Sequence, residues 1–270
     1  MDAHNDSPPT PGPPPPPVCS RIVCGIDGSA EGVGAVAESA RLVPEDGHLL
    51  LVAAILPGIA DSVISALRPP QLSAEDELHG QARAALEDAR AAVGTEAVVS
   101  TVLRTGPPAP ILEAEVAEFG ADTLAVGSHG RGRAAGVVLG SVATRLIHHA
   151  ACSVLVSRSS AGADPRVILV GVDGSEGSLR ALRAGQQLSD RMGGRLRAVQ
   201  IGADGPPAGG LPGEIEVLHD AGKPAHVLIA QTPADGLLVV GSRGLRGIKA
   251  LGSVSEVVAH RAACSVLIVR

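Results

Sequence analysis

The sequence predicts an α/β protein built from two Rossmann-like domains, each a five-stranded parallel sheet flanked by helices. Short valine- and leucine-rich segments alternate with longer amphipathic ones, a pattern typical of a parallel sheet with helices on both faces. Four blocks of sequence also occur twice in the same order, which indicates two homologous domains rather than many small repeats. With 270 residues, each domain has enough chain to bury its own core.

The repeated blocks set the domain boundaries. They begin at Ile22, Gly127, Gly140 and Ala150 in the first half, and their copies begin at Ile168, Gly241, Gly252 and Ala262. We therefore place the first domain at 21–158, a linker at 159–165 and the second domain at 166–270. Residues 1–20 are rich in proline and have no apolar periodicity, so we expect an extended, disordered tail.

The first domain is expected to alternate strands and helices along its whole length. Aliphatic runs predict the strands, and apolar residues that recur on one face predict the helices between them, as Leu78, Ala82 and Leu86 do in the second helix. In order, we expect strand 21–27, helix 30–42, strand 48–55, helix 72–93, strand 97–103, a helix opening after Pro107-Pro108, a strand ending at Val126, a helix starting near Ser141, and strand 153–157.

The second domain repeats this pattern with one loss. Asp27 and Gly127 are 100 positions apart, whereas their counterparts Asp173 and Gly241 are separated by 68. A strand over 196–201 is followed by a glycine- and proline-rich stretch where the first domain has a loop and a helix. The second domain is therefore predicted to lack the helix after its second strand.

Composition excludes several classes of function. The net charge of −6 argues against broad nucleic-acid binding, and the absence of Trp and Tyr removes the side chains on which single-stranded bases stack. No signal peptide is recognisable, and no apolar run approaches the length of a membrane span, so we expect a cytoplasmic protein without a membrane partner. The four cysteines have no metal-type or redox-type spacing; Cys152 and Cys264 begin equivalent strands and are expected to pack in the core.

One glycine-rich stretch has the context of a phosphate site. Gly127 and Gly130 follow a predicted buried strand, and nine residues later Gly140 and Ser141 precede an amphipathic helix. Glycines allow close approach of backbone amides, and a helix N-terminus supplies unpaired N–H groups and the positive end of a dipole. Ligands in such folds bind beyond the carboxyl ends of the strands, where Asp27 and Gly127 are both predicted to lie.

With this motif and the repeats, the chain resembles a tandem universal stress protein, and the resemblance covers nearly its whole length. The family signature, G-x2-G-x9-G-[ST] downstream of a strand that ends in aspartate, is met by Gly127, Gly130, Gly140 and Ser141. The resemblance implies the adenine-nucleotide alpha-hydrolase-like fold. It also implies that this loop holds the phosphates of ATP, with Mg²⁺, and that Asp27 meets the adenine or its surroundings.

Several residues have two interpretations. The Ser141 hydroxyl, with the amides of Ser141 and Val142, would bind phosphate, or Ser141 would be an ordinary helix N-cap. Asp27 would accept a hydrogen bond from adenine or cap the turn before the first helix. Ala54 is expected to line the adenine pocket. By resemblance, His129 contacts the nucleotide through its backbone rather than as a base, and Arg131 either reaches the terminal phosphate or is solvated.

The second domain keeps a degraded copy of the motif. Asp173, Gly241, Gly244, Gly252 and Ser253 match it by residue type. Only seven residues separate Gly244 from Gly252, and Ser253 to Glu256 also fits a capping box in which Glu256 reaches back to the helix start. We expect nucleotide in the first domain.

The sequence is compatible with three functions. The leading hypothesis is an ATP-binding regulatory protein of the stress response, because the glycine motif has no catalytic constellation beside it and no Walker lysine follows it. The alternatives are a weak ATPase or nucleotidyl transferase and a structural dimerisation module that binds nothing. In the family, fifth strands pair antiparallel, which predicts either an internal pseudo-dimer or a homo-oligomer formed through 153–157 and 265–269.

Overall fold

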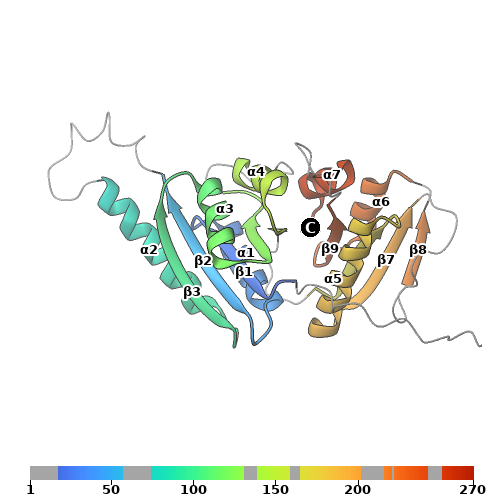
Figure 1. Cartoon of the computed structure of the whole chain (residues 1–270), viewed down its shortest axis with the longest axis horizontal. Helices are drawn as coiled ribbons and strands as arrows, with labels where there is room; N and C mark the ends of the chain where they lie inside the picture. Colours follow the sequence, from blue (N-terminus) through green and yellow to red (C-terminus); the bar gives the residue numbers. More distant parts are fainter. Residues whose placement is uncertain are drawn as a thin grey trace, which may run out of the picture.

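A single ten-stranded sheet runs through the molecule (Figure 1). The computed structural model describes residues 18–56, 74–130, 139–158, 165–201, 216–220, 222–242 and 251–270. The strand order is β3-β2-β1-β4-β5-β10-β9-β6-β7-β8, so each half of the chain supplies five consecutive positions of the sheet. Every pairing is parallel except that of β5 with β10, where the two halves meet.

The first half places its first strand in the middle of its own part of the sheet. Its elements are β1 (Arg21–Ile26), α1 (Ala30–Leu42), β2 (His48–Ile55), α2 (Ala74–Ala92), β3 (Val98–Thr105), α3 (Pro108–Phe119), β4 (Thr123–Gly127), α4 (Ser141–His149) and β5 (Ser153–Ser157). Because β1 pairs with β2 on one side and β4 on the other, the chain reverses its direction of travel across the sheet there. The carboxyl ends of β1 and β4 therefore form the switch point at which ligands bind in such sheets.

The second half has the same strand order. Its described elements are β6 (Val167–Val172), α5 (Glu176–Met192), β7 (Arg195–Ile201), β8 (Glu216–Asp220), α6 (Pro224–Gln231), β9 (Leu237–Gly241), α7 (Ser253–Arg261) and β10 (Ser265–Val269). The residues between β7 and β8, on which the predicted loss of a helix falls, lie outside the described residues, as do most of the predicted tail and linker.

Helices cover both faces of the sheet, and two apolar clusters fill the space beneath them. One cluster joins α1, α2 and α5 to side chains such as Ile22 and Cys24, and the other joins α3, α4, α6 and α7 to Val23 on the opposite face of β1. This alternation follows from the two-residue period of a strand. Small aliphatic residues dominate both clusters, and Cys152 and Cys264 are buried in the second, as predicted.

The helices begin and end at local signals. The side chain of Ser29 accepts a hydrogen bond from the Gly32 amide (3.1 Å) and caps α1, and Ser175 caps α5 in the same way through the Ser178 amide (3.2 Å). Pro108 occupies the first turn of α3, and Gly120, at φ 67°, ends that helix in the left-handed conformation that favours glycine. The sequence predicted the start of α1 at residue 30, and it placed the start of α3 directly after Pro108, one residue later than the structure does.

The two halves join through their fifth strands. Leu155 of β5 pairs with Leu267 of β10 in an antiparallel register, and every residue of both strands is buried. The predicted internal pseudo-dimer is therefore the arrangement seen within one chain, and association of two chains stays a prediction. In the described part of the chain, no helix has both the length and the apolar character of a transmembrane span.

Candidate nucleotide site

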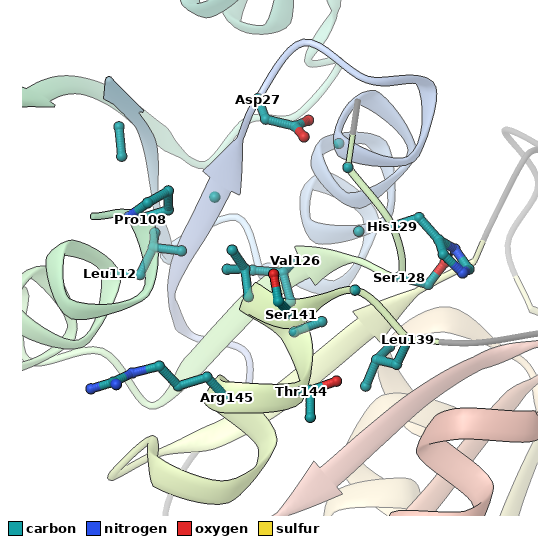
Figure 2. Close-up of a pocket in the computed structure, with 18 of the residues that line it drawn as sticks. Asp27, Pro108, Leu112, Val126, Ser128, His129, Leu139, Ser141, Thr144 and Arg145 are labelled. Carbon is teal, nitrogen blue, oxygen red and sulfur yellow. The ribbon is translucent and has the colours of Figure 1, made fainter. Parts of the chain in front are cut away.

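A cavity of about 840 Å³ opens at the carboxyl ends of β1 and β4 in the first half (Figure 2). The ends of β1 and β2, the start of α3, the loop after β4 and residues along the whole of α4 line it. It brings together eight of the nine residues that the sequence predicted for the first site: Asp27, Ala54, Gly127, His129, Gly130, Gly140, Ser141 and Val142. The ninth, Arg131, lies outside the described residues.

Gly127 has a packing reason to be glycine. A Cβ on this residue would lie 2.7 Å from the Glu31 carbonyl carbon and 2.9 Å from its oxygen, closer than real Cβ contacts. The first turn of α1 therefore packs directly on the end of β4. Gly241 has the same relationship in the second half, where a Cβ would lie 2.3 Å from the backbone of Gly177. This glycine of the motif fixes the approach of a helix whether or not a ligand is bound.

Gly130 lies against Asp27. A Cβ at Gly130 would be 2.6 Å from Asp27 Oδ2. The other carboxylate oxygen, Oδ1, accepts hydrogen bonds from the Ser29 amide (2.9 Å) and the Ser29 hydroxyl (2.5 Å). Asp27 therefore does stabilise the turn that opens α1, which confirms one of its two interpretations. Its second oxygen faces the glycine loop.

The N-terminus of α4 has no side-chain cap. Gly140 is the N-cap residue, with φ −65° and ψ 158°, and its amide donates to the Ser128 carbonyl at 2.8 Å. The interpretation of Ser141 as an N-cap is therefore wrong: Gly140 takes the extended conformation that a cap requires, and Ser141 is already the first helical residue. Ser141 is exposed, and it lines the cavity together with Val142.

His129 is not placed as a base. Its Nδ1 lies 2.9 Å from the Ser128 hydroxyl, and its Nε2 is buried with no hydrogen-bond partner among the described residues. Figure 2 shows both side chains directed away from Asp27 and Ser141. The backbone of the His129 loop borders the cavity while the imidazole lies to one side.

The opposite part of the cavity is apolar. Val52 and Ala54 of β2, Val126 of β4 and Pro108 and Leu112 of α3 line it. Sequence reasoning named only Ala54 among them, although Val52 follows from it, because residues two apart in a strand share a face. No local signal pointed to Leu112.

Arg145 also lines the cavity from α4, and sequence reasoning missed it too. Its guanidinium lies 3.3 Å from the Glu113 carboxylate of α3, and half of its side chain is exposed. A cation therefore stands at the rim, held loosely by an exposed ion pair.

The second half repeats part of this geometry. Gly252 caps α7 without a side-chain bond, as Gly140 caps α4, and Asp173 accepts the Ser175 amide at 3.0 Å. The predicted capping box is wrong, because Ser253 lies one residue inside the helix. Glu256 instead contacts His148 of α4, with 3.7 Å between Oε1 and Nε2. Gly244 lies outside the described residues.

Among the residues that the structure describes, no group of three or more His, Cys, Asp and Glu side chains has the arrangement of a metal site. His148 and His149 lie on α4, and both belong to the cavity lining.

Comparison with known proteins agrees with the fold and the motif. The model of the universal stress protein family matches residues 19–158 and 207–270. A universal stress protein of Mycolicibacterium smegmatis is 30% identical, over 92% of this chain and 96% of its own length. A universal stress protein of Mycobacterium tuberculosis is 29% identical over the same shares of both chains.

A solved structure confirms the arrangement of both halves. The crystal structure of a universal stress protein from Archaeoglobus fulgidus is 18% identical and has a TM-score of 0.69, covering 93% of this chain and 98% of that one. At this identity the likeness establishes the fold alone. The family match and the curated relatives, which span the tandem, together show that this chain belongs to the universal stress protein family.

Proposed function

We propose that this chain is an ATP-binding regulatory protein, and that ATP occupies the cavity of its first half. One observation carries the proposal: an α-helix N-terminus with no side-chain cap opens into a cavity whose opposite part is apolar. Such a cavity offers backbone donors to an anion and a surface to a flat base. Its volume of about 840 Å³ lies in the range of small-molecule sites.

The phosphates would lie over the first turn of α4. The amides of Ser141 and Val142 belong to the N–H groups that have no partner within the helix, and the Ser141 hydroxyl is beside them. The helix dipole favours negative charge at the same place. Gly130 and Gly140 leave room for the phosphate chain to approach the backbone.

The base would lie between Ala54, Val52 and Leu112, which provide an apolar surface. Asp27 would accept a hydrogen bond from the nucleoside part, because carboxylate oxygens accept from amino and hydroxyl groups. Ser29 holds Asp27 through two hydrogen bonds, so this acceptor is fixed before a ligand arrives. A fixed acceptor lowers the entropic cost of binding.

Mg²⁺ would bind with the triphosphate and neutralise part of its charge. The described residues supply no metal cluster of their own, so its ligands would be phosphate oxygens and water. Nothing in the described cavity favours rapid hydrolysis: the His129 imidazole lies to one side, and Asp27 is engaged by Ser29. These features support binding and regulation over an ATPase or nucleotidyl transferase.

Melting the purified full-length chain with and without ATP and Mg²⁺ tests the proposal. A ligand that binds only the folded state raises stability by about 2.7 kcal/mol at a hundred times its Kd. We expect ATP to raise the melting temperature and GTP to raise it less. Because the chain has no Trp or Tyr, bound adenine would also dominate the ultraviolet absorption of a sample that retained nucleotide. An unchanged melting temperature at millimolar ATP would reject the proposal.

A further inference from the structure

The same set of contacts occurs on both sides of the β5–β10 pair, where the two halves meet. The Arg158 amide donates to the Ser265 hydroxyl at 3.0 Å, and the Arg270 amide approaches the Ser153 hydroxyl at 3.4 Å. Each guanidinium also donates to a carbonyl of the neighbouring helix: that of Arg158 to Ala259 and that of Arg270 to Ile147. The two sides thus use equivalent residues in equivalent contacts.

The symmetry fails at one pair of positions. Glu38 of α1 is 5% exposed, and its Oε2 accepts a hydrogen bond from the Ser265 hydroxyl at 2.7 Å. Its counterpart is Ala184 of α5, since both residues lie equally far along their helices from the capping serines. One side of the junction therefore contains a carboxylate next to its serine, and the other side has a methyl group there.

A cavity of about 280 Å³ lies on the side that lacks the carboxylate. Ala184 and Ser153 both line it, as do three arginines: Arg180, Arg183 and Arg270. The α1 positions that correspond to Arg180 and Arg183 are Gly34 and Ala37, so these two arginines have no counterpart on the other side.

The arginines have unused hydrogen-bonding capacity. The Nε atoms of Arg180 and Arg270 are buried and have no hydrogen-bond partner among the described residues. Arg180 makes an ion pair of 3.2 Å with Glu176, whose side chain is largely exposed, and such pairs hold a guanidinium weakly. Arg183 is exposed at the edge of the cavity.

Asp122 is the acidic residue in the lining, and its oxygens are already engaged. They accept hydrogen bonds from the amides of Ser20 (2.9 Å) and Arg21 (2.8 Å) and from the Thr123 hydroxyl (2.7 Å). The lining therefore contains three arginines and one carboxylate whose oxygens are already hydrogen-bonded, so it has an excess of positive charge.

We propose that this cavity binds a small oxyanion, a carboxylate or a phosphate. One of its oxygens takes the place that the Glu38 carboxylate has on the other side and accepts from the Ser153 hydroxyl. Guanidinium groups bind either anion through charge-assisted hydrogen bonds. Asp122 and Ser153 come from the first half, whereas α5 and Arg270 come from the second, so the bound anion stabilises the contact between the halves.

Calorimetric titration of the full chain with inorganic phosphate and with succinate, at matched ionic strength, tests this site. We expect saturable binding of at least one of them, and the stronger one identifies the class of anion. Arg183→Gln should weaken it by about tenfold, because the variant loses a charged donor at an exposed position without a structural role. Arg83→Gln, the same change at an exposed position of α2, should leave binding unchanged.

Ala184→Glu gives a second test, because it places on α5 the carboxylate that α1 has. We expect this variant to lose binding of whichever anion binds the wild-type chain and to retain its response to ATP. The proposal is overturned if neither anion binds the wild-type chain, or if Arg183→Gln binds as tightly as the wild type. In the second case the anion lies elsewhere, for example at the start of α4, so the result leaves the proposed ATP site untouched.

Discussion

Gly130 lies directly against the carboxylate of Asp27: a Cβ on Gly130 would be 2.6 Å from Asp27 Oδ2. These residues are far apart in the sequence: Asp27 follows the carboxyl end of β1, and Gly130 follows that of β4. The glycine therefore allows the acidic group and the phosphate loop to come together. The first prediction below depends on this close approach.

Gly130→Ala should weaken ATP binding while the protein stays folded. The new methyl group must displace the Asp27 carboxylate from its place beside the loop. Loss of this acceptor, one hydrogen bond of about 1 kcal/mol, corresponds to roughly a fivefold increase in Kd. Isothermal titration calorimetry measures it. Gly94→Ala is the matched control, since a Cβ there meets nothing within 4 Å. Equal affinities for the two variants would show that the contact between Gly130 and Asp27 does not matter.

Gly127→Ala should act on stability rather than on the ligand alone. Its Cβ would meet the backbone of Glu31 at 2.7 Å, and backbone atoms cannot rotate out of the way as a side chain does. We expect a loss of about 1–3 kcal/mol in the free energy of unfolding without any nucleotide present, measured by urea denaturation. Unchanged stability would mean that α1 does not pack on β4 as described.

Ser141→Ala should lower ATP affinity by roughly fivefold, because it removes one hydrogen bond of about 1 kcal/mol. It should have little effect on stability. The reason is that Gly140, not Ser141, is the N-cap of α4. Ser29→Ala provides the contrast, because Ser29 does cap α1 and its loss should cost about 1 kcal/mol of stability. The two free energies of unfolding, compared in one experiment, decide whether Ser141 has a capping role.

Glu38 should make stability depend on pH. Burial raises the pKa of its carboxyl above the ordinary value, with hydrogen bonds from serines acting in the other direction. Between the ordinary and the raised pKa, the folded state therefore holds a proton that the unfolded chain releases. This contribution to stability is complete below the ordinary carboxyl pKa and is lost as the pH rises through the raised value.

Glu38→Gln removes this titration and keeps an acceptor for Ser265. The stability of the variant relative to wild type should be lowest in acid and should increase as the pH rises toward neutrality. Urea denaturation of both proteins across that range measures the difference. A difference that stays constant with pH would contradict the assignment of a raised pKa to Glu38.

The sequence predicted most of the first half because its signals are local. The boundaries of α1, β2 and β5 agree with the predicted ones. The capping residue Ser29 marks the start of α1, and aliphatic runs mark the two strands. We could predict that Asp27, Gly130 and Ser141 lie in one cavity, because the carboxyl ends of parallel strands meet at a switch point. The family resemblance added the expected ligand.

Other features could not be predicted because they depend on contacts between distant residues. Nothing near Gly127 in the sequence indicates that Glu31 packs on it, and nothing near Leu112 indicates that it lines the cavity. The two capping assignments failed for a different reason. Ser141 and Ser253 belong to a residue type that often caps helices. In each case, however, the preceding glycine has the extended conformation of the N-cap, so the serine is the first residue of the helix.

Calorimetric titration of ATP into the nucleotide-free, folded full-length chain tests the central claim most directly. If the uncapped start of α4 and the apolar wall around Ala54 form an adenine-nucleotide site, the titration will show saturable heat with one nucleotide bound per chain. A folded sample that gives no heat at millimolar ATP would contradict it.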